Sequence, residues 1–334
     1  MRRALVTGAT GLVGSYIVER LLAEGWSVRA LVRAPSAELT ALGVESVVGD
    51  VLDADAFTKA AEGCEIVFHT AAVIIAGGGW EAYRRPNVDG ARNAIAAAER
   101  AGARLLQLSS VAVYSKRYED PSKKTDEDSP LDPLPDRAYY GRSKRESEQL
   151  VLEAHAAGRI WATAVRPCVI YGRRDRHCVP RTARLLQRRF APVIGGGRST
   201  MALVHAGNVA DGAVLAATSE VAGGRAYNLA NDFEVTVRDF FVLGAEGLGR
   251  RLHLIPIPLV AARAAFAILY RGLRLLSGGR ASFVSRESLS MITRDNPYDS
   301  TRARRELGWA PRGPPAEGIP DAFRWWRETQ ERKH

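Results

Sequence analysis

Two side chains near the middle of the chain have the types and the spacing that acid–base chemistry needs. Tyr140 and Lys144 are four residues apart in 138–157, a stretch whose pattern predicts a helix, so the phenol and the ammonium fall on one face. A phenol titrates at about pH 10, and use near neutrality needs a shift of roughly 3 units, or about 4 kcal/mol. One positive charge about 4 Å away supplies roughly that much at an effective dielectric constant of about 20. The pair therefore predicts an acid–base tyrosine, although the same spacing arises by chance on many helices.

A glycine-rich turn at the N-terminus offers a second kind of chemistry. It joins an apolar strand near 3–7 to a helical pattern, with glycines at 8, 11 and 14. Gly8 would allow the tight turn, Gly11 a close approach of a pyrophosphate, and Gly14 close packing of the helix on the strand. The free N–H groups and the positive end of the helix would hold the phosphates. We interpret the turn as a dinucleotide site; the alternative is a plain strand–turn–helix without a ligand.

The first half of the chain alternates short apolar strands with helical patterns. Strands are expected near 3–7, 27–32, 44–48, 66–69, 105–108 and 163–166, and helices near 11–24, 54–61, 81–101 and 138–157. This alternation predicts an α/β fold with a parallel, doubly wound sheet and right-handed crossovers. Ligands of such sheets bind beyond the carboxyl ends of the strands, so the residues after each strand are the candidates for chemistry.

Three residues after the second and third strands bear on the cofactor. Arg33 stands where an acidic residue commonly bonds the ribose of NAD, and a basic residue favours the additional 2′-phosphate of NADP. A surface arginine in a loop is the alternative. Asp50 could accept from the adenine amino group, with the backbone of Val51 at the ring edge, or it could cap a helix.

The residues after the fourth strand are small. Thr70, Ala71 and Ala72 would let a cofactor lie flat on the backbone, whereas His69 is interpreted as a packed histidine because no acid partner is near in the sequence. Asn87 is either a structural amide that bridges strand and helix or an N-cap.

The composition is that of a globular protein, with 46% hydrophobic and 25% charged residues. The three cysteines form no CxxC pair, so we expect no metal site and no disulfide framework, and a reducing cytoplasm is the simplest compartment. The apolar run after Met1-Arg2-Arg3 is too short and too broken for a secretion signal.

The net charge of +10 is unevenly distributed. Eight arginines stand against one acidic residue, Asp175, in 173–198: Arg173, Arg174, Arg176, Arg181, Arg184, Arg188, Arg189 and Arg198. They indicate an anionic neighbour, such as a cofactor phosphate, an acidic carrier or a membrane surface, or else a solvated helix face. Nucleic acid is not expected, because aromatic residues are not interleaved with these arginines.

Taken in order, the motifs resemble one protein family over nearly the whole chain. They are Gly8, Gly11 and Gly14; Gly49-Asp50-Val51; His69-Thr70-Ala71-Ala72; Asn87; Ser109-Ser110 with Val113-Tyr114; Tyr140-Gly141-Arg142-Ser143-Lys144; and 166–172, 203–210, 226–229 and 298–309. The chain resembles the extended short-chain dehydrogenases/reductases. Each motif alone is weak, and their order makes the resemblance specific.

The resemblance implies a Rossmann domain, an NAD(P) cofactor and a Ser-Tyr-Lys triad. Ser110 would polarise the substrate oxygen, Tyr140 would exchange its proton, and Lys144 would lower the tyrosine pKa and bond the nicotinamide ribose. A hydride would pass between nicotinamide and substrate carbon. The loop from Pro167 would close over the nicotinamide. The cofactor contacts implied are Gly8, Thr10, Gly11, Leu12, Val13, Gly14, Arg33, Asp50, Val51, Thr70, Ala71, Ala72, Tyr140, Lys144, Pro167 and Val169.

The same resemblance predicts how the chain is divided. Residues 1–172 would form the Rossmann domain, with 203–230 returning to it. Residues 173–202 and 231–334 would form a smaller, mostly helical substrate-binding part. Helices near 81–101 and 138–157 would mediate a homodimer, as is the habit of the family.

Two stretches separate the branches of the family. Dehydratases of this family carry an Asp-Glu pair after the triad serine, where this chain has Val111-Ala112, so dehydration is disfavoured. An apolar stretch at 254–271, with Arg263 inside it and Arg271 and Arg274 at its end, resembles a segment of the 3β-hydroxysteroid dehydrogenase-like and dihydroflavonol reductase-like branch.

The apolar stretch has four interpretations. A lid or wall over a hydrophobic substrate is favoured, and an ordinary buried helix is almost as strong. A helix in the membrane interface would use the basic flank around 254–274. A membrane span is the weakest, because Arg263 and two prolines interrupt it.

Three functions follow from these interpretations. The first is an NADP(H)-dependent oxidoreductase, with NAD(H) as the other cofactor, that interconverts a ketone and a secondary alcohol on a steroid-, terpenoid-, polyketide- or long-chain-keto-like substrate. The second is a sugar-nucleotide epimerase with tightly bound NAD, whose diphosphate the arginines of 173–198 would hold. The third is a non-catalytic NADP-sensing regulator. We expect a cytoplasmic protein that either is free or contacts a membrane peripherally.

Overall fold

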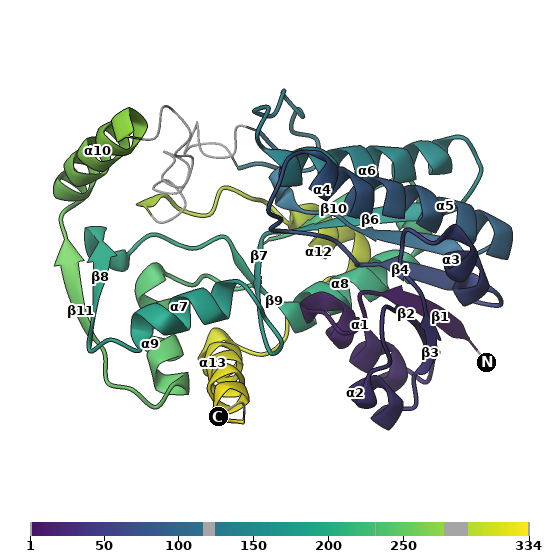
Figure 1. Cartoon of the computed structure of the whole chain (residues 1–334), viewed down its shortest axis with the longest axis horizontal. Coiled ribbons are helices and arrows are strands. Elements are labelled where there is room, and N and C mark those ends of the chain that lie inside the picture. The colour runs from purple at the N-terminus through teal and green to yellow at the C-terminus, as the bar shows by residue number, and fades with distance from the viewer. Residues whose placement is uncertain (1, 116–123, 231, 277–292, 333–334) are drawn as a thin grey trace.

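Seven parallel strands form the central layer of the structure, which is a computed structural model that describes residues 2–115, 124–230, 232–276 and 293–332 (Figure 1). Their order in the sheet is β10-β6-β5-β4-β1-β2-β3. The strands are β1 (Arg3–Thr7), β2 (Ser27–Val32), β3 (Glu45–Val48), β4 (Ile66–His69), β5 (Arg104–Leu108), β6 (Ala162–Pro167) and β10 (Ala226–Leu229). All six strands predicted from the sequence are present, with ends within one residue. Most of them are continuous apolar runs that suit strands covered on both faces, whereas β3, at the edge of the sheet, is largely exposed.

Helices cover both faces of this sheet. On one face lie α1 (Leu12–Ala23) and α8 (Ala206–Thr218), and on the other α3 (Ala54–Ala61), α5 (Gly90–Ala101) and α6 (Tyr139–Ala156), as Figure 1 shows. A short helix, α2 (Ala37–Ala41), follows β2. Neighbouring residues of β1 point to opposite layers, Val6 to the core with α1 and Leu5 to the core with α3. The predicted doubly wound Rossmann architecture is thereby confirmed.

The helix predicted over 81–101 contains a widened turn. It consists of α4 (Glu81–Arg84), a π-helical turn at Arg85–Asp89, and then α5. Pro86 has no N–H to donate to the preceding turn, which explains why the regular pattern gives way there. The widened turn carries Asn87, whose side chain reaches Ser143 on α6.

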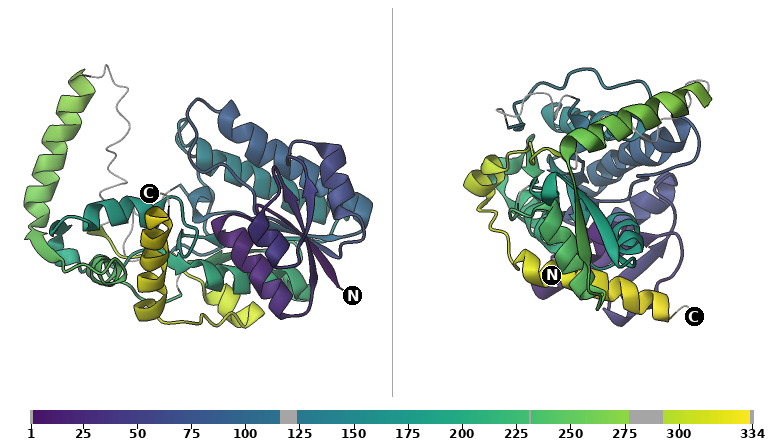
Figure 2. Two further views of the ribbon diagram at one scale, coloured as in Figure 1. Left: turned by 60° about the horizontal axis from the view of Figure 1, so that its bottom comes forward. Right: turned by 90° about the vertical axis from the view of Figure 1, so that its left-hand side faces the viewer.

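A second group of elements packs around a core of its own beyond β6 (Figure 2). It comprises α7 (Cys178–Leu186), β8 (Phe190–Ile194), α9 (Val237–Gly247), β11 (His253–Ile257) and α13 (Pro315–Glu331). Leu186, Phe240 and Phe323 are buried at its centre. β7 (Val169–Tyr171) and β9 (Leu203–His205) pair in parallel at the junction with the Rossmann half, while β8 pairs with β11.

The chain returns to the large sheet twice. After β9, α8 packs against α1 and β10 adds a strand beside β6. A second return was not anticipated: α12 (Thr301–Leu307) packs on β10 and α8, and Trp309 Nε1 donates to the carbonyl of Asn208 at 2.9 Å. The stretch 298–309 therefore packs with the Rossmann core rather than with the predicted substrate-binding part. The other domain boundaries stay predictions.

The apolar stretch forms β11 and a long helix, α10 (Leu259–Leu276), at the end of the molecule opposite the N-terminus (Figure 1). Its side chains are described as far as Ala267, and most of them are exposed, Val260 to 78%. The described part of α10 does not form an ordinary buried helix, and the interpretation of this stretch as a lid or wall over a substrate stays a prediction. None of the described helices is long and apolar enough to cross a bilayer. Residues 277–292 of the predicted substrate part lie outside the described residues.

Candidate active site

Ser110 and Tyr140 meet at the carboxyl end of β5. Ser110 lies two residues beyond the strand, and Tyr140 is in the first turn of α6. The two side chains are hydrogen-bonded, and Ser110 Oγ also accepts from the Ala112 N–H at 3.1 Å. Gly141 permits this contact, because a Cβ there would lie 2.5 Å from the carbonyl oxygen of Ala112. Burial raises the pKa of the Tyr140 phenol and the Ser110 hydrogen bond partly opposes this, so the phenol is protonated at neutral pH.

Lys144 is buried below this pair, with 3% of its surface exposed. Its Nζ donates to the carbonyl oxygen of Leu108, the last residue of β5, at 2.5 Å. Burial lowers the pKa of Lys144 to about 8, while Glu148 one turn further along α6 acts in the opposite direction. The expectation that Lys144 lowers the tyrosine pKa stays a prediction. The buried ammonium of Lys144 needs a hydrogen-bond acceptor, and the carbonyl oxygen of Leu108 at the end of β5 supplies it. Burial and the Ser110 hydrogen bond act on the pKa of Tyr140.

A buried ion pair supports α6 from behind. Arg166, at the end of β6, binds both carboxylate oxygens of Glu148 at 3.0 and 3.1 Å through Nε, and its Nη1 donates to the Tyr114 hydroxyl at 2.6 Å. Tyr114 in turn donates to Asn228 Oδ1 on β10 at 2.9 Å. Arg166 and Glu148 are almost completely buried. The sequence analysis missed this network, although Glu148 lies four residues after Lys144 and so on the same helix face.

The glycine turn is built for close approach to a ligand. Gly8 has φ 71°, and the Gly11 N–H donates to the Gly8 carbonyl at 2.8 Å. A Cβ on Gly14 would lie 2.2 Å from that same carbonyl oxygen, so α1 packs at a distance that only glycine allows. Gly11 begins α1 without a side-chain cap, and no acidic residue lies in its first turn. The N–H groups of the first turn therefore suit a phosphate, and the residues present fit a dinucleotide.

The remaining residues implied as cofactor contacts lie around this turn. Thr10, Leu12, Ala71 and Ala72 are exposed or half-buried, whereas the Val13 side chain is buried in the sheet core, which leaves only its backbone to face a ligand. Thr70 Oγ1 donates to the Thr7 carbonyl at 2.7 Å and so ties β4 to the glycine turn. The cofactor contacts themselves stay predictions.

Arg33, Asp50 and Val51 lie at the ends of β2 and β3, on the far side of the glycine turn from β4. Arg33 is exposed and makes no ion pair with any described residue. Asp50 Oδ1 accepts from the Leu52 N–H at 2.9 Å, and the cap of α3 is Asp53, so Asp50 is not the helix cap. Asn93 holds the Val51 carbonyl at 2.9 Å, which fixes the loop that would meet the adenine.

His69 is a packed, structural histidine, as expected. Asn87 is the structural amide that was one of its two interpretations. His69 Nδ1 bonds Thr7 Oγ1 at 2.9 Å, and burial lowers its pKa to about 3, so the ring is neutral. Asn87 exchanges hydrogen bonds with the backbone of Val73 at 2.7 and 2.9 Å and donates to Ser143 Oγ at 2.9 Å. It thus joins the loop after β4 to α6. Pro167 ends β6 and is buried, and Val169 begins β7 half-buried.

The arginines of 173–198 fall into two sets, one that forms ion pairs with described residues and one that does not. Arg173 lies 3.6 Å from Glu19 and from Asp321, and Arg174 pairs with Glu19 at 3.1 Å and with Glu38. These two therefore join α1, α2 and α13 and are not open to an anionic ligand. The other six are exposed and make no ion pair with any described residue.

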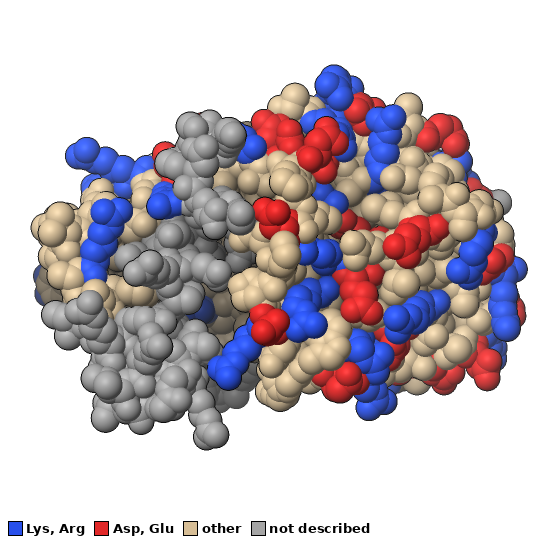
Figure 3. Space-filling model, turned by 90° about the horizontal axis from the view of Figure 1, so that it is seen from above, with Lys and Arg blue, Asp and Glu red and all other residues tan. Residues whose placement is uncertain are grey.

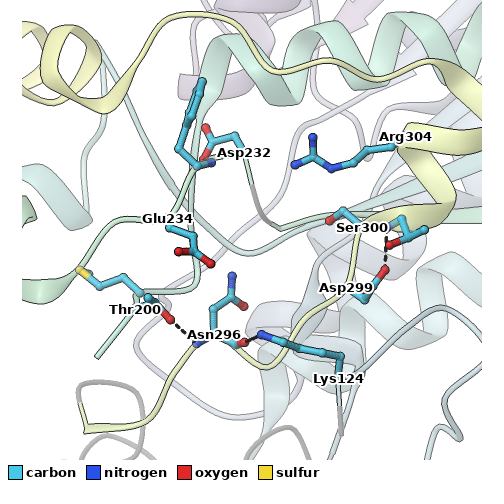
Figure 4. A pocket seen from close by; sticks show the side chains of 11 residues that line it. Lys124, Thr200, Asp232, Glu234, Asn296, Asp299, Ser300 and Arg304 are labelled. Atoms are coloured by element: carbon cyan, nitrogen blue, oxygen red, sulfur yellow. Dashed lines mark hydrogen bonds between the residues drawn. The ribbon is translucent and has the colours of Figure 1, made fainter. Parts of the chain in front are cut away.

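A polar cavity of about 260 Å³ lies beyond the carboxyl end of β10 (Figure 4). Lys124, Thr200, Asp232, Glu234 and Arg304 are among its lining residues. Lys124 Nζ donates to the Asn296 carbonyl at 2.5 Å, and Thr200 Oγ1 accepts from the Asn296 N–H at 3.1 Å. The charged lining differs from the apolar wall that the sequence predicts for a substrate site.

The comparisons with known proteins agree with this geometry. Residues 4–230 match the family model described as the NAD dependent epimerase/dehydratase family. The chain is 33% identical to a 4-hydroxy-2-methyl-3-oxo-4-farnesyl-3,4-dihydroquinoline-1-oxide ketoreductase of Stigmatella aurantiaca, over 96% of each chain. It is 30% identical to a 3 beta-hydroxysteroid dehydrogenase/Delta 5-->4-isomerase of Mycobacterium tuberculosis, over 92% of this chain and 86% of that protein.

A solved structure is similar over the whole length. The crystal structure of gox2253 superimposes with a TM-score of 0.78 at 28% identity and covers 98% of this chain and 99% of its own. The chain therefore belongs to the NAD dependent epimerase/dehydratase family, the extended short-chain dehydrogenases/reductases, in the branch of 3β-hydroxysteroid dehydrogenases and dihydroflavonol reductases, and it is an NAD(P)-dependent oxidoreductase that acts on CH–OH and C=O groups.

Proposed function

We propose that this enzyme reduces a ketone to a secondary alcohol on an apolar small molecule, with NADPH as the preferred cofactor. The observation that carries the proposal is the hydrogen-bonded pair of Ser110 and Tyr140 beside an apolar loop. That the relatives act on farnesylated quinolines and steroids by name supports the same class of substrate.

The apolar loop follows β4 and is held next to the active-site helix. Ile74 and Ile75 are 45% and 72% exposed, which is unusual for isoleucine. Asn87 bonds both Val73 and Ser143, and Ser143 Oγ donates to the Tyr140 carbonyl at 2.8 Å. These bonds hold the loop within reach of the catalytic tyrosine. The two isoleucines are therefore the proposed apolar contacts of the substrate.

Each residue of the triad has a role that its surroundings support. The nicotinamide, when bound, supplies or accepts a hydride. Ser110 hydrogen-bonds the substrate oxygen next to Tyr140, which holds a proton at neutral pH and gives it to that oxygen as negative charge develops there. Lys144 places a positive charge below the tyrosine and offers donors to the cofactor ribose. Because burial keeps the Tyr140 phenol protonated at neutral pH, its proton is present for the direction of carbonyl reduction.

Arg33 supports the preference for NADPH. It is exposed directly after β2 and has no ion-pair partner among the described residues, so its guanidinium is available to a 2′-phosphate. Glu38, the acidic residue that follows in α2, pairs with Arg174 instead.

A sugar-nucleotide epimerase is the second candidate, because the polar cavity beside β10 would suit a hydrated substrate. The two functions differ in cofactor balance: a reductase consumes NADPH, whereas an epimerase has no net consumption. We would assay steroid, terpenoid, quinolone-like and long-chain keto compounds with NADPH and NADH in parallel, following nicotinamide absorbance. The proposal expects oxidation of NADPH with an apolar ketone. Conversion of UDP-sugars without an absorbance change would overturn it in favour of the epimerase.

A further inference from the structure

The small sheet of β8 and β11 has one covered face and one open face. Side chains alternate along a strand, and Ala191 and Leu254 point into the core of the C-terminal part. Phe190 and Ile255 point the other way and are 51% and 50% exposed. In the parallel register, Ile255 lies opposite Pro192, which is also exposed, so the outward residues form an apolar strip.

Helix α10 continues from this strip, and the side chains that are described for it, as far as Ala267, are mostly exposed. Leu259, Ala262 and Phe266, on one stripe of the helix, are half-buried, and Val260, Ala261, Arg263, Ala264, Ala265 and Ala267 are exposed. Figure 2 shows α10 standing away from the rest of the molecule. Helices in proteins depend mainly on the packing of an apolar face for their stability. The described part of α10 has little packing of this kind, so a surface outside the described residues would stabilise it.

Two stretches of the chain that contribute to this end of the molecule contain basic residues and no acidic ones, whereas the neighbouring helix α9 carries Asp239 and Glu246. No acidic residue occurs in 176–210 or in 247–286, which contain six and seven arginines. Among them, Arg188, Arg189, Arg250, Arg251 and Arg263 are exposed and make no ion pair within the described residues. Figure 3 shows basic residues predominating at this end, whereas both signs are mixed over the Rossmann half.

We propose that the outward face of β8 and β11, together with α10, docks on an anionic lipid surface. Apolar side chains such as Phe190, Ile255 and Val260 enter the boundary between headgroups and acyl chains, while the arginines meet lipid phosphates. A second copy of the chain fits less well, because a symmetric contact would bring this positive surface against itself. The docking is independent of the identity of the substrate.

The test is sedimentation of the full chain with lipid vesicles. We expect binding to vesicles that contain phosphatidylserine, weak binding to pure phosphatidylcholine, and a decrease with salt. Each arginine is worth about a fivefold change in affinity, so the double variant Arg188→Gln/Arg189→Gln should lose about 25-fold. Val260→Asp should weaken binding as well. Arg100→Gln and Val221→Asp, exposed positions on the Rossmann half, are the matched controls and should bind as the unaltered chain does.

Two further measurements keep the outcome clear. Turnover of a short water-soluble ketone without lipid should be the same in all variants, which separates loss of docking from loss of fold. Equal affinity for neutral and anionic vesicles, or equal losses in the control variants, would overturn the proposal. Light scattering that shows a dimer broken by Val260→Asp, without vesicle binding, would assign the surface to a second copy and would likewise overturn it.

Discussion

The charged side chains beside the large sheet and those at the end formed by β8, β11 and α10 differ in burial and in pairing. Beside the sheet, Lys144, Glu148 and Arg166 are almost completely buried and tightly bonded. At the far end, Arg188, Arg263 and their neighbours lie on the surface without an acidic partner among the described residues. One end holds its charges in a single geometry, and the other presents them to solvent.

The difference follows from the cost of burying a charge. A buried ammonium or guanidinium must be paired or hydrogen-bonded, so its partners fix the position of the charged group. An exposed arginine loses little by remaining unpaired, and its position is loose. The first arrangement suits catalysis, which needs exact placement of a proton donor, and the second suits attraction to a surface. Five predictions test this contrast, in decreasing order of expected effect.

The largest effect is expected at the tyrosine. Tyr140→Phe removes the proton donor while its ring still packs, so kcat should fall by about 10²- to 10⁴-fold with the affinity for NADPH unchanged. Steady-state kinetics and fluorescence titration of the cofactor measure the two quantities. A variant that keeps most of its activity would remove Tyr140 from the triad.

The buried pair should matter more to stability than any surface pair. Glu148→Gln leaves the Arg166 guanidinium buried without a countercharge, and the free energy of unfolding should fall by about 3–5 kcal/mol. Urea denaturation measures it. The control is Glu99→Gln, which breaks an exposed pair with Arg159 and should cost far less. Equal losses in the two variants would contradict the contrast between the two ends.

Arg33 should distinguish the two cofactors. Arg33→Ala removes a charged hydrogen bond to the 2′-phosphate, worth about 1.5–3 kcal/mol, so the Kd for NADPH should rise by about 10- to 150-fold. The Kd for NADH serves as the internal control and should not change. A parallel rise for both cofactors would place Arg33 elsewhere than at the 2′-phosphate.

The pH dependence should report the state of Lys144. Its pKa is lowered to about 8, so the ammonium is present below that pH and lost above it, and kcat/KM should decline above about pH 8. Because Glu148 raises this pKa, the decline should move to lower pH in Glu148→Gln, measured at a temperature where that variant is folded. An unmoved alkaline limb would show that another group titrates there.

The smallest effect is expected from the surface arginines. Arg188→Gln/Arg189→Gln should alter the free energy of unfolding by less than about 0.5 kcal/mol, because neither side chain is buried or paired among the described residues. Thermal denaturation measures it. A large loss would mean that these arginines support the fold, contrary to the contrast drawn above.

Much of the fold was predictable because its signals are local. Six of the seven strands of the large sheet are short apolar runs that the sequence predicts, and their ends were predicted within one residue. The glycine turn was predictable because only glycine fits its backbone. The helices α2 and α8 and the strand β10 were not predicted as elements. The widened turn at Pro86 was not predicted either, because it depends on a missing N–H donor, which periodicity does not report.

The amino-acid order alone thus determined the alternating elements, the sequence of motifs and the pairing of Tyr140 with Lys144 on one helix face. Tertiary structure decided which charges are neutralised: Arg173 and Arg174 by Glu19, Glu38 and Asp321, and Arg166 by Glu148. It also decided that Lys144 bonds the end of β5 and that the described side chains of α10 are mostly exposed. Secondary structure follows from interactions a few residues apart, whereas the partner of a charge or the cover of a helix comes from segments that only folding brings together.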